Sequence, residues 1–308
     1  MGRPSVGPRT YPIAVTVLIP GAGEAAIMNP SELRRAYAHL RTNRPLGMLS
    51  RARRGLVFVH VPKCGGTSVE RALRRRYRLG RRAIAPEETF AAARAVLGAA
   101  DDEAGRHETL VRASALRCDL LHLHLAEGAR LVTGHAPLGP RTLDAFGPTH
   151  DFVTVMRGPA ERMRSHLAFN RTPQAGHGRS DLSVTRFLET PRARVLGALY
   201  VKYLSGLPMT ADLGTPEAVD AARRTVDRLA LVGFTDAMDV FADRLAALTG
   251  ARLRIGHENQ GASAPLPSGA LERIEDLCAP DRVVYAHARE RFGERRVTPR
   301  SGAPGAGG

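Results

Sequence analysis

The feature that most constrains the fold is a strand-like segment that runs directly into a glycine-rich turn and then into a helix. Residues 56–61 (LVFVHV) form a nearly continuous apolar run rich in β-branched side chains. Such a run is typical of a strand that is buried on both faces of a parallel sheet. The turn at residues 62–68 (PKCGGTS) follows, and residues 69–77 have the pattern of a helix. This order predicts a parallel α/β sheet with the turn at its carboxyl edge.

Short apolar segments alternate with helical segments along the rest of the chain. We expect further strands at residues 129–133, 151–156 and 230–234. Helices are expected at residues 86–128 with a polar break at 101–105, at 159–170, at 236–249, and at 269–292 with a break at Pro280. Residues 171–190 are rich in glycine, proline and arginine and are interpreted as a loop. The predicted fold class is α/β, with a P-loop-NTPase-like central parallel sheet flanked by helices.

The chain of 308 residues shows no internal repeat and no interdomain linker. We therefore expect one domain at residues 51–295, preceded by a partly disordered extension at residues 1–50. Residues 296–308 end in a glycine-rich stretch and are expected to form a flexible tail.

No membrane span or export signal is recognisable in the sequence. The most apolar early stretch, residues 11–20, is much shorter than the roughly 20 residues that a spanning helix needs. No signal-peptide arrangement precedes it. The 3 cysteines are odd in number and widely spaced, which suits a reducing compartment and makes no metal-ligand pattern. The predicted location is the cytoplasm.

The charge of the chain indicates an anionic partner without identifying it. Lys+Arg total 45 and Asp+Glu 30, a formal net charge of +15. Nucleic acid, anionic lipid and phosphorylated cofactors are all attracted to such a surface. Almost all of these cations are arginine, and lysine occurs only at Lys63 and Lys202. The arginine clusters at residues 71–82 and 223–228 are interpreted as solvated helix faces that also steer anions.

The glycine-rich turn has the makings of a phosphate site. Backbone N–H groups of Gly65, Gly66, Thr67 and Ser68 are free to face an anion at a helix N-terminus, and Lys63 adds a full charge. The lysine of a nucleotide-triphosphatase P-loop follows the glycines, whereas Lys63 precedes them. A tight turn with a solvated lysine is the alternative interpretation of these residues alone.

A second strand, turn and helix occur at residues 153–166 (VTVMRGPAERMRSH). Arg157 stands at the carboxyl end of the expected strand, and Ser165 lies on the following helix. Ligands of open α/β sheets bind in the crevice beyond the carboxyl ends of the strands. Arg157 and Ser165 are therefore expected to hold a second phosphate of the ligand whose first phosphate meets Lys63.

These two motifs resemble those of the sulfotransferases that use 3′-phosphoadenosine 5′-phosphosulfate (PAPS). Residues 60–68 (HVPKCGGTS) resemble the 5′-phosphosulfate loop of that superfamily, and residues 155–165 resemble its 3′-phosphate motif. Residues 133–139 (TGHAPLG) lie between them, as a Gly-His segment does in the carbohydrate group that includes heparan sulfate 2-O-sulfotransferase.

The resemblance extends over residues 55–292 and includes residues 231–236 (LVGFTD) and 257–260 (HENQ). Two positions depart from the family pattern without removing a phosphate-contacting group. Cys64 stands where a small residue or threonine is usual, and Gly158 replaces a frequent aspartate. The eukaryotic carbohydrate members usually carry an N-terminal membrane anchor. No such anchor is recognisable in this sequence, so we expect a soluble bacterial-type relative.

The resemblance implies a function and a set of site residues. The chain is expected to transfer the sulfuryl group of PAPS, with release of PAP, to a hydroxyl of a carbohydrate or of another small-molecule or glycoconjugate acceptor. Lys63 would stabilise the leaving phosphate and His135 would act as the base, with no metal required. The implied cofactor-binding residues are Lys63, Cys64, Gly65, Gly66, Thr67, Ser68, Arg157 and Ser165.

Other candidate side chains are weighed against structural roles. His122 and His124 lie in a leucine-rich helical stretch without a carboxylate or cysteine cluster, so a metal role is not expected. His60 lies on the buried strand and is interpreted as structural. Lys202 is either an acceptor or second cofactor contact, or a surface lysine whose stem packs on apolar residues.

Two other functions are consistent with parts of the sequence. A P-loop-like phosphotransferase, such as a small-molecule kinase, shares the predicted fold, but it needs a lysine after the glycines and a carboxylate for magnesium. A basic nucleic-acid-binding protein would explain the net charge of +15, but aromatic residues are 5% of the chain and tryptophan is absent. The segments expected to select the acceptor, residues 80–128 and 171–205, carry no recognisable motif.

Overall fold

The structure is a computed structural model that describes residues 15–17, 26–28, 54–256 and 266–293. Most of the predicted N-terminal extension, the predicted tail at 296–308 and the motif at 257–260 lie outside the described residues. The chain divides into two compact units, Met1–Arg53 and Arg54–Gly308. In the first unit, strand β1 (Val15–Val17) pairs antiparallel with strand β2 (Ala26–Met28).

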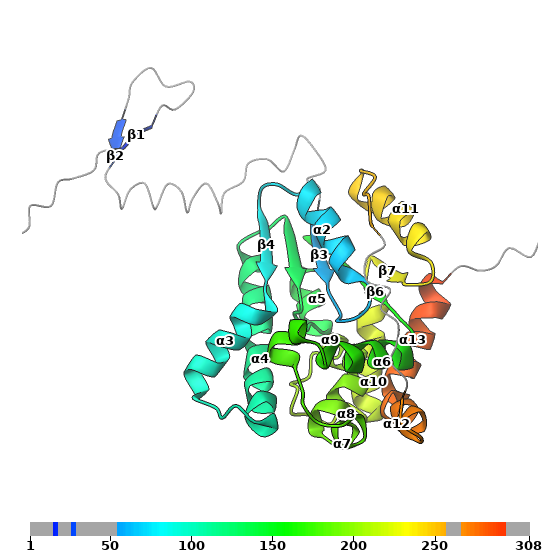
Figure 1. The fold of residues 1–308 in the computed structure, drawn as a ribbon. Coiled ribbons are helices and arrows are strands. Elements are labelled where there is room, and N and C mark those ends of the chain that lie inside the picture. Colours follow the sequence, from blue (N-terminus) through cyan, green and yellow to red (C-terminus); the bar gives the residue numbers. More distant parts are fainter. Residues whose placement is uncertain (1–14, 18–25, 29–53, 257–265, 294–308) are drawn as a thin grey trace, which may run out of the picture. The chain divides into compact units, whose positions relative to one another are not determined.

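The second unit is built on a five-stranded parallel sheet in the order β4-β5-β3-β6-β7 (Figure 1). Its central strand is the apolar run expected from the sequence. The strands are β3 (Gly55–Val59), β4 (Arg81–Ile84), β5 (Leu131–Gly134), β6 (His150–Met156) and β7 (Leu231–Phe234). On β3, Val57 lies opposite Val132 on one side and Phe152 on the other. The predicted α/β class with a central parallel sheet is confirmed.

Strand β4 differs from the sequence-based expectation, which placed its arginines on a helix face. Arg81 and Arg82 instead belong to an edge strand on which only Ile84 is buried. An edge strand with one buried side chain has no apolar alternation to reveal it.

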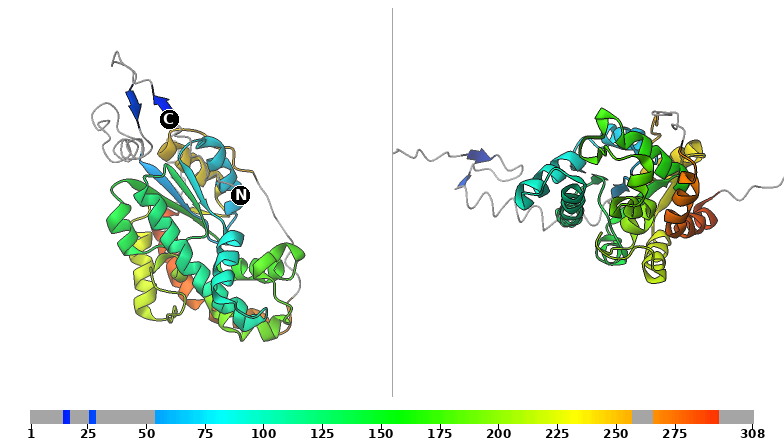
Figure 2. Two further views of the ribbon diagram at one scale, coloured as in Figure 1. Left: turned by 90° about the vertical axis from the view of Figure 1, so that its left-hand side faces the viewer. Right: turned by 60° about the horizontal axis from the view of Figure 1, so that its bottom comes forward.

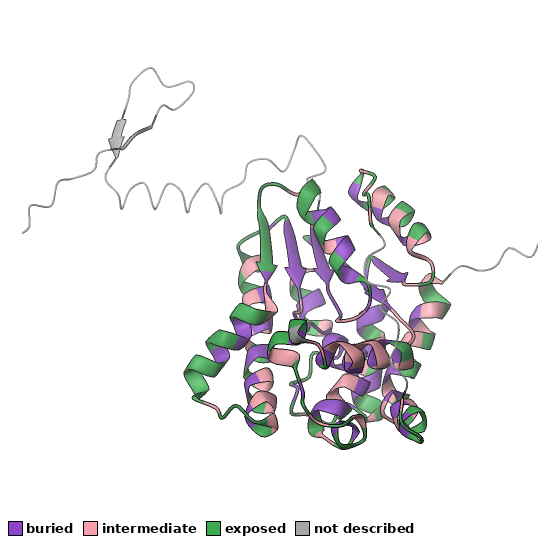
Figure 3. Cartoon of the chain, in the orientation of Figure 1, coloured by how far each residue is buried: buried purple, intermediate pink, exposed green. Residues whose placement is uncertain are grey.

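Helices cover both faces of the sheet, which Figure 2 shows from two further directions. Helices α2 (Gly66–Arg76) and α11 (Met238–Thr249) pack on the face formed by Leu56 and Phe58. The opposite face, formed by Val57 and its neighbours, meets helices α4 (Glu103–Ala126), α5 (Pro140–Phe146), α9 (Leu199–Leu204), α10 (Pro216–Val226) and α13 (Ala279–Phe292). Successive strand residues point to opposite faces, so both layers bury apolar side chains (Figure 3).

The remaining helices surround the carboxyl edge of the sheet. They are α3 (Pro86–Leu97), α6 (Pro159–Asn170), the 3₁₀ helix η1 (Pro173–Gly178), α7 (Val184–Leu188), α8 (Pro191–Gly197) and α12 (Ala270–Leu277). The prediction of a loop at 171–190 is wrong, because η1 and α7 lie there. Ser183 caps α7 by accepting a hydrogen bond from the Arg186 N–H, and Phe187 is buried in a separate apolar cluster.

The predicted helices at 86–128, 159–170, 236–249 and 269–292 are confirmed, with boundaries shifted by a few residues. The helix expected to break at Pro280 ends at Leu277, and Pro280 stands in the first turn of α13. Among the described residues, no helix is both long enough and apolar enough to cross a membrane.

A buried ion pair joins the helices beneath the carboxyl edge. Arg162 Nη2 lies 2.9 Å from Asp281 Oδ2, and neither side chain is exposed to solvent. Asp281 also accepts hydrogen bonds from the backbone N–H groups of Tyr200 and Val201. The Tyr200 hydroxyl in turn accepts from the Arg157 N–H and donates to the Arg157 carbonyl. The ion pair thereby holds the backbone that presents Arg157.

Candidate active site

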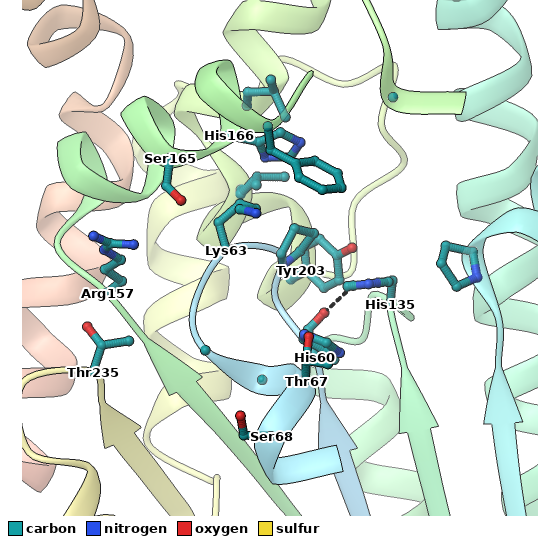
Figure 4. Close-up of a pocket in the computed structure, with 18 of the residues that line it drawn as sticks. His60, Lys63, Thr67, Ser68, His135, Arg157, Ser165, His166, Tyr203 and Thr235 are labelled. Carbon is teal, nitrogen blue, oxygen red and sulfur yellow. Dashed lines mark hydrogen bonds between the residues drawn. The ribbon is translucent and has the colours of Figure 1, made fainter. Parts of the chain in front are cut away.

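A cavity of about 1150 Å³ lies where the carboxyl ends of the parallel strands meet. Parallel strands end at the same edge of the sheet, so residues that are distant in the sequence are brought together there. Eight residues predicted from the sequence line it: Lys63, Gly65, Gly66, Thr67, Ser68, His135, Arg157 and Ser165 (Figure 4). The exception is Cys64, whose thiol is buried in the core 3.5 Å from the Tyr200 hydroxyl.

The glycine-rich turn leads into the N-terminus of α2. Gly65 is the N-cap residue and has a φ of 70°, a conformation that glycine adopts without strain. Gly66, Thr67 and Ser68 form the first helical turn, in which backbone N–H groups have no partner within the helix. Acidic residues are absent from this turn. The start of α2 therefore offers donors and partial positive charge to an anion in the cavity.

Substituting Gly66 with alanine is expected to lower the free energy of unfolding by about 1–3 kcal/mol, because a Cβ there has no room. It would overlap the His60 ring, with His60 Nε2 only 2.5 Å away. Urea unfolding of Gly66→Ala measures the loss. Gly158→Ala is the matched control, because its Cβ would meet only the Glu161 side chain at 3.6 Å. Equal stability of the two variants would contradict the packing argument.

Lys63 is held in an unusual backbone conformation at the mouth of the turn. Its φ of 64° is the only positive value among the described non-glycine residues. Such a conformation costs free energy and is found where the fold must aim a side chain. Lys63 Nζ lies over the Phe169 ring, 4.0 Å from its centroid. Burial, with a smaller effect of the Arg157 charge, lowers the pKa of Lys63.

Arg157 faces the same cavity from the end of β6. Its backbone is held by Tyr200, and its Nε lies 3.4 Å from Glu161 Oε2, an exposed carboxylate. Ser165 points into the cavity from α6, between Arg157 and Lys63 in the view of Figure 4. Two cations and a hydroxyl thus converge on one space, an arrangement suited to a ligand with two anionic groups.

His135 is arranged as a neutral base. Its Nδ1 lies 2.5 Å from the His60 carbonyl oxygen (dashed line in Figure 4). A carbonyl only accepts, so Nδ1 carries the proton and Nε2 keeps its lone pair. Burial, followed by the charges of His60 and Arg117, holds the pKa of His135 well below its usual value. The imidazole is therefore uncharged at neutral pH, with its proton on Nδ1.

His60 and Glu70 support His135 from beneath. The rings of His60 and His135 lie tilted to each other by 33°, with centroids 4.4 Å apart. His60 Nδ1 lies 3.0 Å from Glu70 Oε2, and the Thr133 hydroxyl donates to Glu70 Oε1. Burial opposes ionisation of Glu70, but the hydrogen bonds from His60 and Thr133, together with the charges of His60 and Arg74, lower the Glu70 pKa. His60, interpreted from the sequence as structural, is buried as expected and also lines the cavity.

Lys202 lies on the inner wall of the cavity, so the surface-lysine interpretation is wrong. Its side chain comes from α9 and is 7% exposed. Burial, with a contribution from the Arg117 charge, lowers the pKa of Lys202 to about 7.

His166, Phe169 and Asn170 on α6 also line the cavity and were not predicted from the sequence. Residues four apart lie on the same face of a helix, so Ser165 could have predicted that Phe169, one turn further on, also faces the cavity. Thr235 at the end of β7 and residues 253–256 also line the cavity and were not singled out.

Part of the arginine cluster at 71–82 is not a plain solvated helix face. Arg71, Arg74, Arg75 and Arg81 line a groove of about 480 Å³ that shares His60 and His135 with the larger cavity. Within the described part of the chain, no group of three histidine, cysteine or acidic side chains is placed to hold a metal ion.

Comparison with known proteins adds a structural likeness. No family model matches the chain, and no curated protein does. Among solved structures, the chain is similar to the crystal structure of a sulfotransferase from Alicyclobacillus acidocaldarius, at 16% sequence identity and a TM-score of 0.41. The match covers 78% of this chain and 96% of that one. A likeness at this level assigns no activity, so the function is inferred from the side chains of the cavity.

Proposed function

We propose that the protein is a sulfotransferase that moves the sulfuryl group of PAPS to a hydroxyl of a carbohydrate or another small-molecule or glycoconjugate acceptor. The observation that carries this proposal is the convergence of Lys63, Arg157, Ser165 and neutral His135 in one cavity. These residues come from the two motifs and the Gly-His segment that resemble the family.

The two anion sites match the two anionic groups of PAPS, the 5′-phosphosulfate and the 3′-phosphate. The N–H groups at the start of α2, with Lys63, would hold the 5′-phosphosulfate, and Arg157 with Ser165 would hold the 3′-phosphate. The cavity of about 1150 Å³ exceeds the roughly 300–1000 Å³ typical of a single ligand pocket. It therefore has room for a nucleotide and an acceptor together.

The residues then divide the work of the transfer. His135 Nε2 takes the proton of the acceptor hydroxyl while that oxygen forms its bond to sulfur. The bond from sulfur to the bridging phosphate oxygen breaks, and its electron pair stays on the phosphate. Lys63 and the α2 N–H groups stabilise the charge that develops there. Arg157 and Ser165 keep the donor aligned for the attack.

The P-loop-like phosphotransferase remains the second candidate, because its fold is shared. The position of Lys63 before the glycines argues against it, since the lysine of a P-loop follows them. Nucleotide selectivity separates the two functions directly.

PAP is expected to stabilise the protein by about 2.7 kcal/mol at 100 times its dissociation constant. ADP and ATP, which lack the 3′-phosphate, are expected to stabilise it much less. Thermal unfolding with each nucleotide measures the difference. Arg157→Ala should remove the preference for PAP, because its guanidinium would hold the 3′-phosphate. The matched control is Arg186→Ala on α7, which does not line the cavity.

The opposite selectivity would overturn the proposal. If ATP stabilises the protein and PAP does not, the 3′-phosphate site is wrong and the phosphotransferase is favoured. If neither nucleotide acts on a folded sample, the alternative of a nucleic-acid-binding protein is tested by salt-dependent DNA binding.

A further inference from the structure

The inner wall of the cavity carries a buried lysine without an anionic partner. Lys202 is 7% exposed and lines the cavity, with its Nζ 5.0 Å from the centroid of the Tyr203 ring. Among the residues that the structure describes, no carboxylate lies within ion-pair distance of Lys202. A buried ammonium group without a partner is costly in free energy.

The neighbouring arginines differ from Lys202, because the protein satisfies them. Arg117 donates to the Thr89 hydroxyl and to a backbone carbonyl. Arg192 contacts both oxygens of Glu103, at 2.8 Å and 2.9 Å, and also donates to a carbonyl. These two cations have their own partners, so the unmatched charge of the inner wall is that of Lys202.

Two α6 side chains that line the same cavity carry unsatisfied polar atoms. Asn170 is 3% exposed, and neither its amide nitrogen nor its amide oxygen has a partner within the described protein. His166 Nδ1 is also buried without a partner. Buried polar atoms are almost always hydrogen-bonded in folded proteins. Orphaned atoms on two cavity-lining side chains therefore indicate a ligand or water that completes them.

His166 links this group to the transfer site. Burial lowers the pKa of His166 to about 3, and the charges of Arg162, Lys63 and Lys202 act in the same direction. The imidazole is neutral, so it donates or accepts without adding charge. His166, Lys63 and Lys202 all line the cavity, and His166 lies beside Lys63 in the view of Figure 4. A molecule held by Lys202 would therefore share one cavity with the proposed sulfuryl donor.

We propose that the acceptor is a hydroxyl-bearing carboxylic acid whose carboxylate binds Lys202, with Asn170 and His166 as further hydrogen-bonding partners. This inference rests on the proposed sulfotransferase function. A single lysine balances at most one negative charge, which favours a carboxylate over a doubly charged phosphate. Because Lys202 and His135 line the same cavity, an acceptor held by its acid group at Lys202 would present its hydroxyl to His135.

The arginine-lined groove is the rival place for an acidic group. Arg74 and Arg81 there interact with Glu70 and with a backbone carbonyl, respectively, whereas Arg75 has no such contact within the described structure. The groove is open to solvent and its arginines are on the surface, so screening weakens their attraction for a single carboxylate. Variants of Lys202 and of Arg75 therefore distinguish the two candidate sites for the carboxylate.

The test uses matched acids and esters as probes on the full chain. Calorimetric titrations, with and without saturating PAP, compare para-hydroxybenzoate with its methyl ester and glucuronate with its methyl ester. For at least one pair, the wild type is expected to bind the acid about tenfold or more tightly than the ester, a difference of about 1.4 kcal/mol. Lys202→Met should remove the preference, and Lys202→Arg should keep most of it. PAP affinity, measured in the same samples, should be unchanged.

The outcomes separate the two proposals. Equal binding of acid and ester by the wild type, or no binding of either acid up to about 10 mM, overturns the acidic acceptor, because a site for a single charge should reach millimolar affinity. So does a preference that survives Lys202→Met or is abolished by Arg75→Ala. Failure of the wild type to bind PAP overturns the sulfotransferase proposal instead. The titrations without PAP then show independently whether Lys202 binds a carboxylate.

Discussion

Replacing His135 with alanine is expected to lower kcat for sulfuryl transfer by about 100-fold to 10,000-fold, the usual contribution of a positioned general base. PAP affinity is expected to stay within about twofold, because His135 is proposed to act on the acceptor and not on PAP. The measurement is PAPS-dependent transfer to a hydroxyl acceptor, with PAP binding determined in parallel.

The expected pH dependence follows from the protonation state of His135. The base acts only when Nε2 is unprotonated, and an ordinary histidine loses that form below about pH 6.5. Because burial holds the His135 pKa well below this value, the unprotonated form persists to more acidic pH. kcat is therefore expected to stay level as the pH falls from about 8 to about 6. A kcat that follows an ordinary histidine titration in this range would contradict the assignment.

His122→Ala is the matched control for His135→Ala. His122 lies on α4 and bonds to the Thr142 hydroxyl, and it does not line the cavity. Its loss should leave kcat within about threefold, well below the effect of removing a general base. If His135→Ala transfers sulfuryl groups as fast as this control, another group is the base, and His60 is the next candidate because it lines the same wall.

The second large effect is on stability. Asp281→Ala is expected to lower the free energy of unfolding by about 3–5 kcal/mol, because it leaves the buried Arg162 guanidinium without a counter-charge. Burial raises the pKa of Asp281 to about 6, with Arg162 opposing the rise, so the carboxylate is ionised at pH 7. The backbone N–H groups of Tyr200 and Val201 also lose their acceptor. Urea unfolding at neutral pH measures the loss.

Two further variants test the cause of this loss. Glu275→Ala removes the acidic partner of an exposed pair, in which Glu275 Oε2 lies 2.6 Å from Arg282, and should cost no more than about 1 kcal/mol. Replacing Arg162 and Asp281 together with apolar residues should recover much of the lost stability, because no charge is then left buried. A double variant as unstable as Asp281→Ala would mean that packing or the unsatisfied N–H groups of Tyr200 and Val201, rather than the unpaired charge, cause the loss.

Asp281→Ala should also weaken PAP binding, although Asp281 is not placed in the cavity. Asp281 holds the backbone of Tyr200, and the Tyr200 hydroxyl holds the backbone of Arg157. The affinity loss is expected to be about tenfold or less, because the guanidinium itself remains. An unchanged PAP affinity would show that Arg157 keeps its position without this support.

Several features of this protein follow from the sequence by itself. The apolar run at 56–61, the glycine turn and the helix after it form one continuous segment, so their pattern is local and readable. The same holds for Arg157 at the end of one strand and His135 at the end of another. Because parallel strands end at one edge, their meeting in a cavity was predictable from the order of elements.

Other features were decided only by the tertiary structure. The short edge strand β4 has a single buried residue, and helix α7 begins at a capping serine. Neither feature produces a periodic pattern in the sequence. The state of Lys202 depends on burial by helices far away in the sequence, among them α4 with Arg117. A residue type shows that a charge is present, but only the packing around it decides whether that charge meets water, a carboxylate or an empty wall of a cavity.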